Sequence, residues 1–216
     1  MTLVVCLKQV PAVGEVQIDP QKNTLIREGV PSVINPSDLN ALEVALRLKD
    51  TAGARVIALS MGPGQAREAL QRCLEMGADE AYLLCDPVFA GSDTLATARV
   101  LAKAVTKVAK HFSLLLCGHE SIDGNTAQVG PEIGEILGIP HANNVTKLDL
   151  LPESVQVERR DFQRNAAGFD LGHIQNVVDE IQQVLAARAH QFQVFAMLAG
   201  EIGFRAHEIR KAQYGV

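Results

Sequence analysis

The sequence predicts an α/β fold built on a doubly wound, mostly parallel sheet. Three short apolar runs, at residues 3–9, 55–61 and 114–118, lack the polar alternation of half-exposed strands, which is typical of strands covered on both faces. Stretches with apolar residues at helical spacing separate them. Because strands alternate with helices over about the first 140 residues, we expect βαβ units and therefore a parallel sheet.

The first strand, residues 3–9, leads into a predicted hairpin insertion. Residues 16–18 and 24–26 are β-prone, and the Asp-Pro-Gln-Lys-Asn segment between them is typical of a turn. A helix follows, for which Asn35 or Ser37 is the expected N-cap. Its apolar face consists of Leu39, Ala41, Leu42, Ala45 and Leu46.

The next three strand–helix pairs follow the same logic. Residues 55–61 form a strand that ends at a Gly-Pro-Gly segment, and a helix with Ala69, Leu70 and Cys73 on its apolar side follows. Residues 80–84 form a third strand, followed by a long helix capped by Ser92 or Asp93. Residues 114–118 form the fourth strand. The helix after it has Thr126 as its expected N-cap, and its apolar face is Val129, Ile133, Ile136 and Leu137.

The regular alternation fades after Pro140. Residues 143–150 and 154–160 have the pattern of a hairpin, residues 174–185 that of an amphipathic helix, and residues 192–198 are apolar. We therefore divide the chain into an α/β domain, residues 1–160, and a mainly helical C-terminal extension, residues 161–216. The apolar face of this extension packs either on the domain or on a partner chain.

Composition excludes several classes of function. The chain has 216 residues, a formal net charge of -5 and no basic block, which argues against a nucleic-acid partner. No signal-peptide pattern and no apolar run of membrane-spanning length is found, so we expect a cytoplasmic protein without direct membrane insertion. The four cysteines are Cys6, Cys73, Cys85 and Cys117. They are scattered without a CxxC pair, which favours reduced thiols over a metal site.

The loops that follow the strands define the candidate site. In a parallel sheet the loops at residues 8–12, 61–64 and 118–126 lie at one edge, where ligands bind at the topological switch point. The start of the last helix offers free N–H groups and a positive dipole end to an anion. Gly124 allows a tight turn or close approach to a phosphate, and four side chains add hydrogen bonds: Ser121, Asn125, Thr126 and Gln128.

The residues alone leave two readings of this loop open. One is a nucleotide site; the other is an ordinary strand–helix turn with a capped helix. The chain has neither the GxGxxG fingerprint of a standard Rossmann dinucleotide site nor the GxxxxGK[ST] motif of a P-loop.

Six motifs, in order along the chain, resemble the beta subunit of electron transfer flavoprotein. The resemblance covers residues 3 to about 160. The motifs are Val-Val-Cys-Leu-Lys-Gln-Val from Val4, Asn-Thr-Leu-Ile-Arg-Glu-Gly-Val-Pro from Asn23, Asn-Pro-Ser-Asp from Asn35, Ser-Met-Gly-Pro from Ser60, Met-Gly-Ala-Asp from Met76 and Asp-Gly-Asn-Thr-Ala-Gln-Val-Gly-Pro from Asp123.

This resemblance implies a flavodoxin-like, adenine-nucleotide-binding domain and a heterodimer with an alpha subunit that holds FAD. In ordinary members the beta subunit binds AMP; in electron-bifurcating members it binds a second FAD and receives hydride from NADH. With Lys8 added from the strand edge, the cofactor-binding residues implied are Cys6, Lys8, Asn35, Pro36, Ser37, Asp38, Met61, Gly118, His119, Glu120, Ser121, Ile122, Asp123, Gly124, Asn125, Thr126, Ala127, Gln128 and Val129.

Three functions follow from this interpretation. The first is an electron-transfer subunit that exchanges electrons with dehydrogenase or quinone-reductase partners; the second is a bifurcating, NADH-oxidising subunit; the third is a non-redox nucleotide-binding regulatory module. The run from Asp123 is more similar to the FAD-binding branch. No side chain is expected to be catalytic: in the electron-transfer interpretation a flavin would carry the redox chemistry, and the regulatory module has no redox activity. The acidic, glycine-bearing stretch that carries the family's partner-recognition loop is not found after Asp161.

Overall fold

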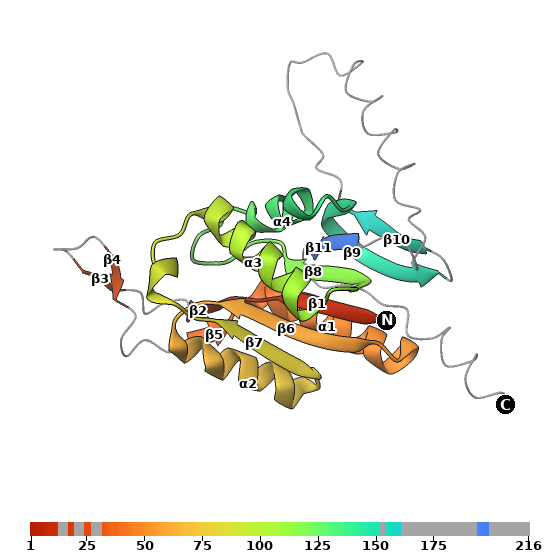
Figure 1. The fold of residues 1–216 in the computed structure, drawn as a ribbon, viewed down its shortest axis with the longest axis horizontal. Helices are drawn as coiled ribbons and strands as arrows, with labels where there is room; N and C mark the ends of the chain where they lie inside the picture. The colour runs from red at the N-terminus through yellow and green to blue at the C-terminus, as the bar shows by residue number, and fades with distance from the viewer. Residues whose placement is uncertain (13–16, 20–23, 27–31, 152–153, 161–193, 199–216) are drawn as a thin grey trace, which may run out of the picture.

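The computed structural model describes residues 1–12, 17–19, 24–26, 32–151, 154–160 and 194–198. Among them, a seven-stranded sheet with the order β10-β9-β11-β8-β1-β6-β7 forms the centre of the molecule (Figure 1). The strands are β1 (Thr2–Cys6), β6 (Arg55–Met61), β7 (Glu80–Leu84), β8 (Leu114–Gly118), β9 (His141–Leu151), β10 (Ser154–Arg159) and β11 (Val194–Leu198).

The sheet is mostly parallel, as the sequence predicts. β1 pairs in parallel with β6 on one side and with β8 on the other. β6 pairs in parallel with β7, and β11 pairs in parallel with both β8 and β9. Only β10 is antiparallel, and it forms the predicted hairpin with β9.

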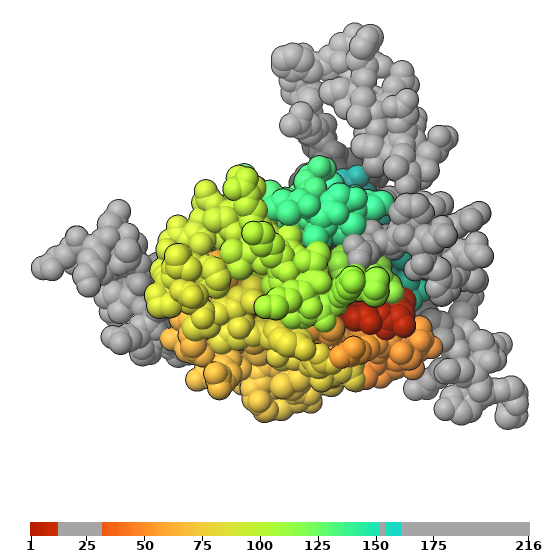
Figure 2. Space-filling view, viewed as in Figure 1, coloured from red at the N-terminus to blue at the C-terminus, as the bar shows by residue number. Residues whose placement is uncertain are grey.

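Helices cover both faces of the sheet. α1 (Pro36–Ala52) and α2 (Arg67–Met76) pack on the face that carries Leu3 and Val5 of β1, while α3 (Thr94–Val108) and α4 (Val129–Leu137) pack on the face of Val4 and Cys6. Strands buried on both faces are continuous apolar runs, since neither face meets water. In the space-filling view the red N-terminal strand therefore surfaces only as a small patch (Figure 2). The doubly wound α/β fold is confirmed.

The short elements complete the described part of the chain. β2 (Gln9–Pro11) pairs with β5 (Ser32–Ile34), and β3 (Gln17–Asp19) pairs with β4 (Thr24–Ile26), so the predicted insertion hairpin is confirmed. Two 3-10 turns, Gly64–Ala66 and Pro87–Phe89, follow β6 and β7. The predicted amphipathic helix at residues 174–185 lies outside the described residues. The apolar run near residue 192 contributes β11 to the main sheet, between β8 and β9.

Candidate functional site

A cleft of about 760 Å³ opens at the carboxyl ends of the parallel strands. β1 is the strand at which the sheet order reverses, because the chain continues to β6 on one side and reaches β8 on the other only after α3. Ligands of open α/β sheets bind at such a switch point. The cleft floor is formed by the ends of β1, β6 and β8, and its volume is within the range of small-molecule sites.

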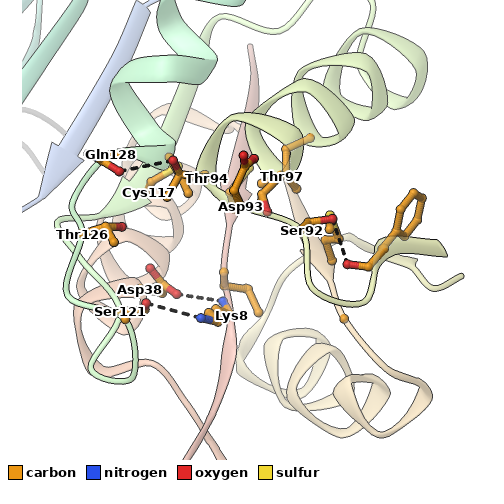
Figure 3. Close-up of a pocket in the computed structure, with 18 of the residues that line it drawn as sticks. Lys8, Asp38, Ser92, Asp93, Thr94, Thr97, Cys117, Ser121, Thr126 and Gln128 are labelled. Atoms are coloured by element: carbon orange, nitrogen blue, oxygen red, sulfur yellow. Dashed lines mark hydrogen bonds between the residues drawn. The ribbon is translucent and has the colours of Figure 1, made fainter. Parts of the chain in front are cut away.

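Lys8 connects the end of β1 to the loop between β8 and α4. Its Nζ lies 2.7 Å from Oδ1 of Asp123. It also lies 3.4 Å from Oγ of Ser121, a contact that Figure 3 shows. The Lys8 side chain is 44% exposed, whereas that of Asp123 is 11% exposed. Although partial burial opposes ionisation of Asp123, the Lys8 and Ser121 contacts outweigh it and lower the pKa of this carboxyl. Lys8 is therefore a cation at the mouth of the cleft that also holds the loop.

Asn35 fastens the start of α1 to the same loop. The residue is fully buried; its Nδ2 donates to the Glu120 carbonyl at 2.8 Å, and its Oδ1 accepts from the Ile122 N–H at 3.1 Å. Asn35 is the N-cap residue of α1, as predicted, but its side chain makes no capping hydrogen bond. An amide suits this position because it donates to one backbone group and accepts from another.

Asp38 joins the two central strands beneath the cleft. Its Oδ2 accepts from the Lys8 N–H at 2.8 Å, and its Oδ1 accepts from the Gly118 N–H at 3.0 Å. Burial raises the pKa of Asp38 to about 7, against the opposing effect of these two hydrogen bonds. The carboxyl therefore fixes the relative position of β1 and β8 at the cleft floor.

Gly118, rather than Gly124, is the glycine that close packing requires. A Cβ at Gly118 would lie 2.3 Å from Oδ1 of Asp38 and 2.5 Å from the Ser37 carbonyl carbon. Gly124 has no positive φ, and a Cβ there would meet only Ser121 Oγ at 3.5 Å, an ordinary contact. Gly124 does lie in a tight turn, since its N–H donates to the Ser121 carbonyl at 3.3 Å, but this turn does not require a positive φ; its approach to a ligand stays a prediction.

Two non-glycine residues of the β8–α4 loop have left-handed backbone conformations. Asn125 has φ +47° and Ala127 has φ +52°. Asparagine tolerates this region, whereas alanine pays an energetic cost of about 1–2 kcal/mol. Strained residues of this kind cluster at ligand-binding loops, so the loop geometry supports a functional role for this segment.

The start of α4 differs from the prediction. The helix begins at Val129, and the N-cap residue is Gln128, which makes no side-chain capping bond. Thr126 is exposed and precedes the cap by two residues, so its prediction as the N-cap is wrong. Ala127 has a left-handed backbone conformation, so the chain turns between Thr126 and the first residue of the helix. Without a side-chain cap, the first N–H groups of α4 are available to an anion.

The start of α3 faces the start of α4 across the cleft. Asp93 is the predicted N-cap and accepts from the Ala96 N–H at 2.7 Å. Thr94 Oγ1 lies 3.2 Å from Gln128 Oε1, a contact that Figure 3 shows. It also lies 3.2 Å from Glu132 Oε1, and the two contacts join α3 to α4. Two helix N-termini thus border the same cleft.

The structure brings most of the predicted site residues together. Those that line the cleft are Cys6, Lys8, Asp38, Met61, Gly118, His119, Glu120, Ser121, Gly124, Thr126, Ala127, Gln128 and Val129. The other six do not line it; they flank it in the α1 start or in the β8–α4 loop, and they are Asn35, Pro36, Ser37, Ile122, Asp123 and Asn125.

Sequence reasoning missed one wall of the cleft. This wall is the loop after β7 with the start of α3, and its lining residues include Cys85, Asp86, Pro87, Phe89, Ala90, Gly91, Ser92, Asp93, Thr94 and Thr97. The rule that selected the loops after β1, β6 and β8 applies equally to β7, which is parallel to them. That rule was sufficient to find this wall, although no residue motif marks it.

The donor set of the cleft fits a nucleotide rather than a metal ion. Nδ1 of His119 is buried without a hydrogen-bond partner within the described part of the chain, which leaves one polar ring atom for a ligand beside the uncapped α4 start. Within the same residues no group of three or more His, Cys, Asp or Glu side chains is arranged to hold a metal ion. None of the described helices is both long enough and apolar enough to span a bilayer.

Comparison with known proteins agrees with this geometry. The electron transfer flavoprotein domain model matches residues 22–168. The electron transfer flavoprotein subunit beta of Clostridium acetobutylicum is 54% identical over 159 residues, which are 74% of this chain and 61% of that protein. The caffeyl-CoA reductase-Etf complex subunit CarD of Acetobacterium woodii is 50% identical over 161 residues, again 74% and 61%.

A third relative, the protein FixA of Azorhizobium caulinodans, is 49% identical over 166 residues, covering 74% of this chain and 59% of FixA. The chain thus spans about three fifths of the length of these relatives. The family model covers more than half of the chain, including β6, β8 and the β8–α4 loop. The chain belongs to the electron transfer flavoprotein domain family.

Proposed function

We propose that this chain is a beta-type electron transfer flavoprotein subunit that binds an adenine nucleotide, AMP or FAD, in the cleft. It transfers electrons together with an alpha subunit that holds FAD. The observation that carries this proposal is the convergence of an uncapped helix start, a strained loop and a lysine at the switch point of a parallel sheet. The helix start and the lysine favour an anionic ligand, and backbone strain is typical of ligand-binding loops.

The phosphate end of the nucleotide is assigned to the β8–α4 side of the cleft. Val129 and Gly130 supply backbone N–H groups at the start of α4, while Gln128 and Ser121 supply side-chain polar atoms. Lys8 contributes positive charge beside the same loop, where it contacts Ser121 and Asp123. Asp123 compensates that charge, so the free N–H groups at the start of α4 carry the attraction for a phosphate.

The chain's own residues bind and orient the ligand, and no side chain is assigned a catalytic role. A bound flavin would supply the redox chemistry, as cofactors do in flavoproteins generally. Asn35 and Asp38 position the site through other groups. Asn35 holds the β8–α4 loop, and Asp38, which also lines part of the cleft, holds the ends of β1 and β8 together. This division of roles is that of an electron carrier.

A second candidate is a subunit with its own FAD that oxidises NADH, as in electron bifurcation. It is favoured by the extent of the cleft, which continues past the phosphate end to Met61 and to the β7–α3 wall with Phe89. Apolar and aromatic side chains there suit the flat face of a ring system better than a mononucleotide alone.

The names of the relatives indicate the kind of partner. CarD belongs to a complex with caffeyl-CoA reductase, so we propose a dehydrogenase or reductase as the electron partner of this chain. The hypothesis of a non-redox nucleotide-binding module predicts nucleotide binding without any such partner.

The decisive experiment is to purify the chain with and without a co-expressed alpha subunit and to identify the acid-released nucleotide by absorbance and mass. AMP in the beta-type chain supports the first candidate, and FAD retained by this chain alone supports the second. A folded preparation that contains neither, even in the complex, would contradict the assignment of the cleft.

A matched pair of variants makes the result specific. Lys8→Met removes the cation at the cleft and should lower nucleotide content, whereas Lys49→Met removes an equally close ion pair, with Asp79 at 2.6 Å, at the opposite end of the sheet. Equal losses in both variants would mean that the nucleotide does not depend on the cleft.

A further inference from the structure

Two cysteines lie side by side on the floor of the cleft. Cys6 ends β1 and Cys117 lies near the end of β8, and the parallel register of these strands pairs them directly. Both side chains belong to the core on the α3–α4 face of the sheet, so they project to the same side. Both also line the cleft, and they are 6% and 7% exposed. The fold thus brings together two thiols that 110 intervening residues separate in the sequence.

The strand spacing permits a bond between these sulfurs. Neighbouring strands lie about 4.7–4.9 Å apart, and the Cα atoms of disulfide-bonded cysteines are about 4.4–6.8 Å apart. The thiols also affect one another in the reduced protein, because the neighbouring Cys6 thiol and burial raise the pKa of Cys117. The Cα separation expected for this register is therefore within the range of a disulfide.

The other two cysteines are excluded by their positions. Cys73 is on α2 and belongs to the core on the opposite face of the sheet. Cys85 follows β7, and β6 separates β7 from β1; two strand spacings are about 10 Å, beyond the reach of a disulfide. The pair of Cys6 and Cys117 is therefore specific.

We propose that Cys6 and Cys117 form a redox-active dithiol that a small soluble disulfide converts into an intramolecular disulfide on the cleft floor. One thiolate attacks the small disulfide, forms a mixed disulfide and releases one small thiol. The second cysteine then attacks the mixed disulfide and releases the other small thiol. In total the two cysteines lose two electrons and two protons, and the small disulfide is reduced to two thiols.

The reaction itself needs no bound nucleotide, although both cysteines line the cleft assigned to the nucleotide above. It gives the floor of the cleft a second chemical state. Transient, regulatory disulfides of this kind occur in reducing compartments, and a dithiol that lines a cleft is accessible to a small reagent without unfolding.

The test is to treat the full chain with hydroxyethyl disulfide, quench with acid, alkylate the remaining thiols and map tryptic peptides by mass. Trypsin places Cys6 in the peptide of residues 1–8 and Cys117 in that of residues 111–147, each with no other cysteine. We expect these two peptides to be cross-linked with the loss of two hydrogens. Recovery of both peptides alkylated, or of a lasting hydroxyethyl adduct on either one, would overturn the proposal.

Single variants test the order of the two steps. In Cys6→Ser and in Cys117→Ser the remaining thiol has no neighbour to displace the mixed disulfide, so the hydroxyethyl adduct should accumulate. In Cys85→Ser the cross-link should form as in the parent chain; its loss there would show a relay through Cys85 and refute the direct reaction. The mapping of the unsubstituted chain decides the proposal even if a serine variant does not fold.

Discussion

The Lys8 ammonium lies 2.7 Å from the Asp123 carboxylate, although 115 positions separate the two residues in the chain. This ion pair connects the central strand to the loop that borders the cleft, so a change at the end of β1 acts directly on the loop.

Lys8→Met should weaken nucleotide retention and lower the free energy of unfolding by about 1–3 kcal/mol, because it leaves the largely buried Asp123 carboxylate without its cation. Chemical denaturation and nucleotide content measure the two effects separately. Lys49→Met, which breaks a comparable exposed pair with Asp79, is the matched control and should leave nucleotide content unchanged. If Lys8→Met retains its full nucleotide content, Lys8 does not belong to the nucleotide site.

Asp38 should make the stability of the chain depend on pH. Its pKa is about 7 in the folded protein against an ordinary 3.8, so the folded state binds a proton that the unfolded state has lost. The contribution of Asp38 to the free energy of unfolding is complete below about pH 4 and declines as pH rises toward 7. Each unit of pKa difference between the folded and unfolded states is worth about 1.4 kcal/mol. Urea denaturation across this range, compared with Asp38→Asn, measures the effect.

Asp79 is the control of opposite sign for that titration. The Lys49 side chain and the Val56 N–H lower the pKa of Asp79, so its contribution to stability is present above its ordinary pKa and is lost as pH falls. Asp79→Asn should therefore remove stability at neutral pH and leave the Asp38 slope intact. A slope that persists in Asp38→Asn would assign it to another group.

Gly118→Ala should destabilise the protein strongly. The new methyl group would overlap backbone atoms of Ser37 and Asp38, and overpacking of this kind costs about 1–3 kcal/mol or more. Gly124→Ala is the matched control in the same loop, because its methyl group meets only an ordinary contact with Ser121. Thermal unfolding compares the two variants; equal melting temperatures would contradict the close packing of Gly118.

Thr126→Ala separates ligand contact from helix capping. Since Thr126 is exposed and is not the N-cap of α4, its loss should change stability by no more than about 0.5 kcal/mol. Asp93→Ala removes a side chain that does cap a helix and should cost about 1 kcal/mol. A lower nucleotide affinity in Thr126→Ala at unchanged stability would place its hydroxyl against the ligand, and an unchanged affinity would remove it from the site.

The sequence was informative wherever a periodic pattern decided the structure. The continuous apolar runs identified β1, β6 and β8, and the carboxyl-end rule located the loops at Lys8, Met61 and Gly118 before any geometry was known. These features follow from local composition and from the fixed chirality of βαβ connections.

Other features depended on long-range contacts that a sequence does not reveal. Asparagine is a favoured N-cap residue, yet the Asn35 side chain does not cap α1. It hydrogen-bonds the backbone of Glu120 and Ile122 instead. Thr126 has a better capping side chain than Gln128, but the left-handed turn at Ala127 delays the helix. In both cases tertiary contacts overrode a local preference. β11 was recognisable only as an apolar run, because nothing local predicts which strands it joins.

The central place of β1 also has a consequence for biosynthesis. β1 precedes both of its neighbours, β6 and β8, in the chain, so one of its two edges stays unsatisfied until Leu114–Gly118 has been synthesised. During this interval an apolar strand is open to incorrect pairing, which is where nascent chains are prone to aggregate and where chaperones act. The cleft floor, formed by the ends of the same strands, is therefore completed only after β8 has joined β1.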